Sequence, residues 1–147
     1  MIDKIDKMIL NELRQDAARP VTKLARYLDL PRSTLQHRIE KMRESGVIKR
    51  TVAIPDYEKI GLPVTAIVLV TFLPTHKGSQ HDVAQAIANI ENIVEVHVVA
   101  GSWDIIVKAR GSSLREIGEL VVDKLRRVPG VGQTMTCGCF FTLKEEP

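Results

Sequence analysis

VTKLARYLDLPRSTLQHRIEKMRESG, residues 21–46, carries the strongest structural signal of the chain. Its apolar residues recur at intervals of three and four before and after Asp29-Leu30-Pro31, a spacing typical of two short amphipathic helices. Pro31 cannot continue the first helix because it lacks an amide donor, but its fixed φ suits the first turn of the second. We expect Leu30 to fill the corner between them. The stretch is therefore predicted to form a helix-turn-helix.

The second of these helices leaves many hydrogen-bond donors outside its apolar stripe. Ser33 and Gln36 have the spacing of a capping box at its start. A helix in the major groove reads bases with side chains near its N-terminus, while Lys and Arg further along hold phosphates. The residues predicted to contact DNA, including a basic pair after the helix, are Arg32, Ser33, Thr34, His37, Arg38, Lys41, Lys49 and Arg50. An ordinary solvated helical hairpin has the same periodicity, so charge has to decide between the two interpretations.

The basic charge of the chain is concentrated in this region. Residues 1–54 hold 12 Lys or Arg against 7 Asp or Glu, whereas residues 55–147 hold 9 against 11, so the net charges are +5 and −2. A local basic surplus is expected where a protein neutralises phosphates. The charge distribution therefore favours DNA binding.

Two further segments complete a small N-terminal domain. Ile2–Ala17 is predicted to be a first helix, because its apolar residues form one ridge. The segment 47–54 is rich in β-branched residues and is predicted to be a strand, which would make the helix-turn-helix winged. The segment 55–63, PDYEKIGLP, then has the composition of a linker. The predicted domains are thus 1–54 for DNA binding and 64–147 beyond the linker.

The pattern of the second domain alternates strands and helices. Strands are predicted at Val64–Leu73, Val94–Val99, Trp103–Ala109 and 131–143, the first of them apolar on both faces. One helix is predicted between the first two strands, and a second, with Ser113 and Glu116 as a capping box, precedes the last. This β-α-β-β-α-β order is the ferredoxin-like arrangement, which makes the whole chain α+β. Two helices cover one face of such a sheet, so the apolar second face predicts at least a homodimer.

Several classes of protein are excluded by composition. The chain of 147 residues is 44% hydrophobic and 27% charged, and it has no apolar run near the ~20 residues that span a bilayer. Its N-terminus carries acids where a signal peptide is apolar, so a cytoplasmic location is expected. Cys137 and Cys139 lack further ligands at metal-binding spacing and are expected to be small packing residues. No metal and no cofactor is predicted.

Motifs along the whole chain resemble one family. They are the opening Ile2 to Arg19, LARYLDLPRSTLQHRIEKMRESGVIK (24–49), PDYEKIGL (55–62), VVAGSWDIIVKAR (98–110) and RVPGVGQTMT (127–136). In this order they resemble the leucine-responsive/asparagine-responsive regulators, the Lrp/AsnC or feast/famine family. The resemblance implies a sequence-specific transcriptional regulator, a winged helix-turn-helix joined to a ferredoxin-like sensing domain, dimers that often assemble into octamers, and a small effector, usually an amino acid, held between dimers.

The resemblance also implies an effector pocket at the corner before the third strand and on the last strand. Gly101 and Ser102 would offer backbone amides to a carboxylate, and Asp104 would take the α-ammonium by a charge-assisted bond. Thr134 and Thr136 would complete the polar end from a neighbouring subunit. From the residues by themselves these are an ordinary turn glycine, a hairpin aspartate and two strand threonines.

The sequence departs from the family pattern at Pro31, where a serine often caps the recognition helix. His76, His81 and the loop between them are not diagnostic, and selectivity for the effector side chain is a possible role of that loop. Trp103 occupies an aromatic position of the family and is expected to pack against a neighbouring dimer rather than to stack on ligand.

Two alternative functions remain open from the sequence. A branch of the family, the siroheme decarboxylases, does chemistry on a tetrapyrrole, and His97 and Arg110 are the histidine and arginine that the sheet offers for it. A sensor acting through protein partners is the other. Both leave the basic recognition helix without a purpose, so we predict a regulator that is not an enzyme.

Overall fold

The computed structural model describes residues 1–145 and divides the chain into two compact units between Ala53 and Ile54. The last two residues of the predicted domain 64–147 lie outside the described part. None of the described helices is long and apolar enough to cross a membrane. Each unit has its own hydrophobic core and is described by itself.

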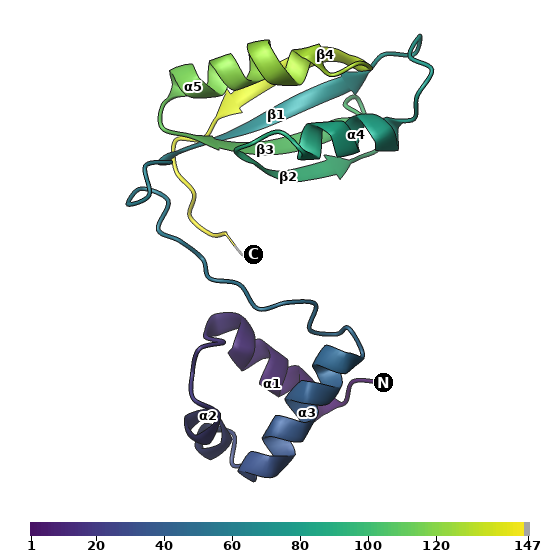
Figure 1. Ribbon diagram of the computed structural model, residues 1–147. Helices are drawn as coiled ribbons and strands as arrows, with labels where there is room; N and C mark the ends of the chain where they lie inside the picture. Colours follow the sequence, from purple (N-terminus) through teal and green to yellow (C-terminus); the bar gives the residue numbers. More distant parts are fainter. Residues whose placement is uncertain (146–147) are drawn as a thin grey trace. The chain divides into compact units, whose positions relative to one another are not determined.

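The first unit is a bundle of three helices. They are α1 (Lys4–Gln15), α2 (Val21–Tyr27) and α3 (Arg32–Glu44), as Figure 1 shows. Ile9, Leu24 and Leu35, one from each helix, are fully or almost fully buried in its core. Helix α1 begins two residues later than predicted because Asp3 caps it. The Asp3 carboxylate accepts a hydrogen bond from the Asp6 amide, and the Asp6 carboxylate accepts one from the Asp3 amide.

The corner between α2 and α3 differs from the prediction at its cap. Pro31 is the N-cap residue of α3, and no side chain caps that helix, so the predicted capping box of Ser33 and Gln36 is wrong. Ser33 already lies in the first turn, where its hydroxyl cannot precede the helix. The corner is made instead by Asp29, which adopts a φ of 52°, and by the Leu30 amide, which donates to the Ala25 carbonyl at 2.9 Å.

The predicted strand at 47–54 is not formed in the structure, and within residues 1–53 there is no other strand. A strand needs a partner for its backbone hydrogen bonds, and the three helices offer none. After α3 the chain turns through Gly46, and the Ile48 amide donates to the Met42 carbonyl at 2.9 Å. The side chain of Ile48 then packs against the helical core, and the residue is not part of a sheet.

The second unit is built on one antiparallel sheet. Its strands are β1 (Val64–Phe72), β2 (Ile93–Val98), β3 (Ile105–Gly111) and β4 (Val131–Gly138) in the order β2-β3-β1-β4. Two central strands therefore carry the apolar sequences, and β2 and β4 form the edges (Figure 1). The element order is the predicted β-α-β-β-α-β.

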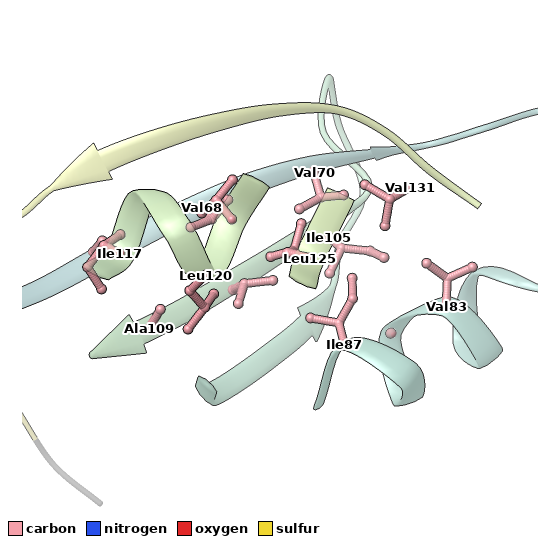
Figure 2. Close-up of a cluster of buried hydrophobic side chains, with 14 residues drawn as sticks. Val68, Val70, Val83, Ile87, Ile105, Ala109, Ile117, Leu120, Leu125 and Val131 are labelled. Carbon is pink, nitrogen blue, oxygen red and sulfur yellow. The ribbon is translucent and has the colours of Figure 1, made fainter. Parts of the chain in front are cut away.

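Two helical segments cover one face of this sheet. The first is α4 (Gln80–Ala88); the second is α5 (Leu114–Glu119), which continues as a π-helical turn (Leu120–Lys124) and a 3₁₀ turn (Leu125–Arg127). Figure 2 shows their apolar side chains meeting those of β1 and β3. Ser113 caps α5 as predicted, but Glu116 accepts from the Ser112 amide rather than from Ser113, so only half of the predicted box forms.

The opposite face of the sheet is not covered by any helix of the described unit. Residues directly opposite in antiparallel strands share a face, so Ile67 lies beside Cys137 and Leu69 beside Met135. The side chain of Met135 is 48% exposed. The centre of this open face is apolar and consists of Ile67, Leu69, Ile106 and Met135, as the sequence predicted, whereas charged and polar side chains (Glu95, His97, Lys108 and Arg110) lie on the same face around it.

Strand β4 ends at Gly138, five residues before the predicted end. Its partner β1 begins at Val64, and the last bond between the two runs from the Cys139 amide to the Thr65 carbonyl at 2.9 Å. The chain beyond has no strand to pair with, and Phe140 and Phe141 are exposed. Both cysteines are exposed in the single chain, with Cys137 on the open face and Cys139 past the end of the strand, so neither packs within the unit as predicted.

Candidate functional site

Helix α3 presents most of its polar side chains to solvent. The core takes Leu35, Ile39 and Met42, which leaves the remaining side of the helix outside. The predicted DNA-contacting residues that are exposed are Arg32, Ser33, Thr34, His37 and Lys41 on the helix, and Lys49 and Arg50 after it. Gln36 is exposed as well, and it is a further candidate that the predicted capping role had concealed.

Arg38 differs from the other predicted contacts. Its Nη1 donates to Asp3 Oδ2 and to Asp6 Oδ1, both at 2.7 Å, and its side chain is 26% exposed. Hydrogen bonds from the Asp6 amide and from Arg38 lower the pKa of Asp3, and the bonds to Asp3 and Asp6 raise the pKa of Arg38. Arg38 therefore ties α3 to the start of α1 rather than standing free for a base or phosphate.

In the second unit, the corner between β2 and β3 holds the first half of the predicted effector pocket. Gly101 has a φ of +135°, a conformation that L side chains rarely adopt, and both Gly101 and Ser102 are exposed. Asp104 is tied to its surroundings: its carboxylate accepts from the Phe72 amide at 2.7 Å and from Gln80 Nε2 at 3.4 Å. The Asp104 amide also donates to the Val70 carbonyl at 3.0 Å.

A hollow of about 520 Å³ lies beside this corner, along the start of β4. Its lining residues are Trp103, Arg126, Gly132, Gln133, Thr134 and Met135. Arg126 Nε donates to Thr134 Oγ1 at 2.8 Å, which joins the 3₁₀ turn to the edge strand. The lining includes Thr134 but not the other predicted effector residues, Gly101, Ser102, Asp104 and Thr136. Arg126 and Gln133 were missed, although the Arg126-Arg127 pair before the last strand was a visible signal.

The two residues considered for tetrapyrrole chemistry both have carboxylate partners. His97 is exposed and lies 3.3 Å from Glu95. Arg110 is 5% exposed, and its Nη2 lies 2.6 Å from each oxygen of Glu145. Within residues 1–145 no group of three or more His, Cys, Asp or Glu side chains is placed to hold a metal ion.

Comparison with known proteins gives the family. Residues 65–147 match the Lrp/AsnC ligand binding domain, and residues 2–49 match a winged helix-turn-helix DNA-binding domain. The chain belongs to the Lrp/AsnC family. This Lrp/AsnC protein is a transcriptional regulator with a helix-turn-helix domain and a ligand-binding domain, on an α+β fold.

Relatives of similar length support the assignment. An uncharacterized HTH-type transcriptional regulator of Pyrococcus furiosus is 42% identical over 146 residues, which cover 99% of this chain and 97% of the relative. The HTH-type transcriptional regulator FL11 of Pyrococcus horikoshii is 36% identical, and the alignment covers 98% of this chain and 93% of that relative. The alignments therefore include both domains.

Solved structures confirm the fold. A transcriptional regulator of Neisseria meningitidis, in a complex with L-Met, superposes with a TM-score of 0.90 at 19% identity and covers 99% of this chain and 94% of its own. The feast or famine regulatory protein of M. tuberculosis, complexed with L-methionine, superposes with a TM-score of 0.87 at 24% identity, which covers 99% of this chain and 96% of its own. At these identities the likeness concerns the fold alone.

Proposed function

We propose that this Lrp/AsnC protein binds specific DNA sequences as a homodimer and that a small effector, of the amino-acid class, changes its DNA binding or assembly. In this proposal residues 1–54 read DNA, 55–63 connect, and 64–147 bind the effector and hold the subunits together. Assembly of dimers into octamers is the larger state that the family implies. The location that goes with this function is the cytoplasm.

The observation that carries the proposal is the exposed polar side of α3. His37 and Lys41 lie one turn apart on it, with Ser33 and Thr34 a turn earlier. Hydroxyl, imidazole and ammonium groups on the first three turns of a helix can meet base edges and phosphates in a major groove. Lys49 and Arg50 follow in an exposed segment and supply further phosphate contacts.

A small effector is supported by the hollow beside Trp103. Its size is within the usual range of ligand sites, about 300–1,000 Å³. Two proteins of the same fold are described in complexes with L-methionine, which makes an amino acid the first class to test. An effector alters DNA affinity only if it binds one state of the protein better than another, and we propose that these states differ in subunit association.

A homodimer is supported by the open face of the sheet. Ile67, Leu69 and Ile106 are only half-buried in the single chain, although they lie on central strands. An apolar sheet face of this kind is normally covered by a second layer. A second copy of the chain, with its own open face, is the layer we propose.

An enzymatic role is not part of the proposal. The guanidinium of Arg110 is engaged by Glu145 and Thr65, and His97 faces Glu95, so neither supplies a free acid or base at a cavity. The relatives are described as transcriptional regulators.

The test is DNA binding by the purified full chain, measured by fluorescence anisotropy. Its own upstream DNA is compared with random DNA at two salt concentrations, with and without an amino-acid mixture. We expect tighter, salt-sensitive binding to the upstream DNA, a change with the mixture, and weaker binding for Lys41→Ala. Lys59→Ala, an exposed lysine of the second unit, is the matched control and should bind like the wild type. Equal binding to both DNAs without salt dependence would refute the proposal.

A further inference from the structure

We propose that Arg126 binds the carboxylate of the effector in the hollow beside Trp103, and that this site accepts carboxylic acids with or without an α-amino group. The inference rests on the proposed function in one respect: the ligand of the hollow is taken to be the effector. It adds the residue that recognises the ligand and the chemical class that the site selects.

The hollow has one charged group in its lining. Of its six lining residues Arg126 is the only ionisable one; the others are Trp103, Gly132, Gln133, Thr134 and Met135. A hollow with one cation and no carboxylate attracts an anion and offers no ionic partner to an ammonium group. The site therefore favours a ligand that has a negatively charged group, and it binds the ligand through that group.

The guanidinium of Arg126 is held at one of its nitrogens. Its Nε donates to Thr134 Oγ1 at 2.8 Å, which keeps the group beside β4. Among residues 1–145 no acceptor contacts its two terminal nitrogens, which remain as donors for the two oxygens of a carboxylate. The backbone behind it is held by Leu125, which is fully buried in the core of the unit. The hydroxyl of Thr134 and the anchored turn thus preorganise Arg126 for a planar anion.

Asp104 is the aspartate from which the family resemblance implied an ammonium contact. It does not line the hollow. One carboxylate oxygen accepts a hydrogen bond from the Phe72 amide and the other accepts one from Gln80. The carboxylate therefore already links the end of β1 to the start of α4. An α-ammonium group consequently has no free carboxylate beside Arg126, and its loss from a ligand should cost little affinity.

The apolar part of the ligand has its own partners. Trp103, half-buried at the corner, forms a wall of the hollow, and Met135 lines it from β4, with its side chain on the open face beside Leu69. Trp103 and Arg126 together define a ligand with a carboxylate at one end and a medium-sized apolar side chain at the other. A 2-oxo acid and the amino acid of the same side chain both meet this description.

The test is calorimetric titration of the full chain with three compounds for each side chain: the L-amino acid, its 2-oxo acid and its carboxamide, which keeps the amino group but lacks the carboxylate. Methionine, leucine and phenylalanine supply the side chains. We expect the two acids of at least one series to bind within about tenfold of each other and the amide to bind at least about tenfold more weakly, since a charge-assisted pair is lost.

Two variants complete the test. Arg126→Gln should weaken both acids by about 10- to 100-fold. Arg127→Gln is the matched control, because Arg127 is exposed, faces Asp123 at 4.0 Å and does not line the hollow. Melting temperatures of the variants show that both are folded.

The outcomes separate the inference from the proposed function. Amide binding as tight as acid binding, unchanged binding by Arg126→Gln, or no binding by any acid of the panel would each overturn the role of Arg126. An amino acid that binds while its 2-oxo acid does not would overturn the inference that the α-amino group is dispensable. DNA affinity measured on the same samples with and without the amino-acid mixture decides the regulator proposal independently.

Discussion

The guanidinium carbon of Arg110 lies 3.4 Å from the centre of the Tyr57 ring. The same group donates to Thr65 Oγ1 at 3.0 Å and to both carboxylate oxygens of Glu145 at 2.6 Å. Lys108 also contacts Glu145. One buried cation therefore joins three segments of the second unit: the turn before β1, the strand β1 and the C-terminal tail.

This arrangement predicts that losing Glu145 alone costs more stability than losing Glu145 together with the charge of Arg110. Glu145→Ala leaves the guanidinium of Arg110, 5% exposed, without its counterion and should lower the free energy of unfolding by about 1–3 kcal/mol. The double variant Arg110→Met with Glu145→Ala removes both charges and should recover part of that loss. Urea denaturation of the full chain, followed by the fluorescence of Trp103 in the same unit, gives the values. A double variant as unstable as the sum of the two single variants would contradict the role of the pair.

The same contacts predict a dependence of stability on acid. Hydrogen bonds from Lys108 and then from Arg110 lower the pKa of Glu145 from its ordinary value of 4.5. A carboxyl whose pKa is depressed by folding contributes stability above its unfolded pKa and loses it as the pH falls through the folded pKa. The second unit should therefore lose stability as the pH falls below about 4.5. Glu145→Gln should flatten this limb in melting curves taken from pH 6 to pH 3, about the window of carboxyl titration, while Glu58→Gln, an exposed control, should leave it unchanged.

Arg38 is expected to affect DNA binding through the fold of the first unit. From sequence alone, Arg38→Ala should cost about 1–3 kcal/mol of operator binding if the arginine reads a base. Its ion pairs with Asp3 and Asp6 instead predict only a small loss of stability, because solvent screens exposed ion pairs. The double variant Asp3→Asn with Asp6→Asn removes the same pairs without touching Arg38. If Arg38 only joins α3 to α1, this variant and Arg38→Ala should both lower DNA affinity in anisotropy titrations by a similar, small amount. A large loss of affinity for Arg38→Ala alone would show that the arginine contacts DNA.

The open face of the sheet predicts where subunits associate. Leu69→Lys places a charge in the centre of that face and should shift the chain toward monomers in sedimentation velocity, because a buried charge without a partner is costly. Val122→Lys is the matched control, since Val122 is 53% exposed on the helical side. A Leu69→Lys protein that sediments like the wild type would place the subunit interface on another surface.

Periodicity was sufficient for the elements that bury a whole face. The ridge of α1, the two helices around Pro31 and the doubly apolar β1 were all predicted within a few residues of their observed bounds. These signals are strong because every third or fourth residue, or every second one, must be apolar for the core to close. The β-α-β-β-α-β order followed from the same patterns.

The misses lie where structure depends on a partner that the local sequence does not show. The segment 47–54 has strand propensity but no neighbouring strand, and β4 stops where β1 has no more residues to pair with. The surroundings of Arg126 and Asp104 could not be read from the sequence for the same reason. Which polar group faces a hollow, and which is consumed by a backbone amide, is decided by tertiary contacts and not by spacing along the chain.

Asp104 allows a final distinction between a binding and a structural carboxylate. If it takes an α-ammonium, as the family resemblance implied, then both Asp104→Ala and Asp104→Asn should abolish the response to an amino acid while DNA binding persists. The structure favours another result, because Asp104 accepts the Phe72 amide at 2.7 Å. Asn keeps an oxygen for that amide, so Asp104→Asn should still bind the effector in calorimetry.

Asp104→Ala leaves the Phe72 amide without its acceptor and should destabilise the second unit by about 1–3 kcal/mol. Its effector binding should weaken only in proportion to the distortion at the junction of β1 and α4. The comparison of the two variants thus carries the decision. Loss of binding in Asp104→Asn at an unchanged melting temperature would show that the charge of Asp104 meets the ligand, and it would return the ammonium contact to this aspartate.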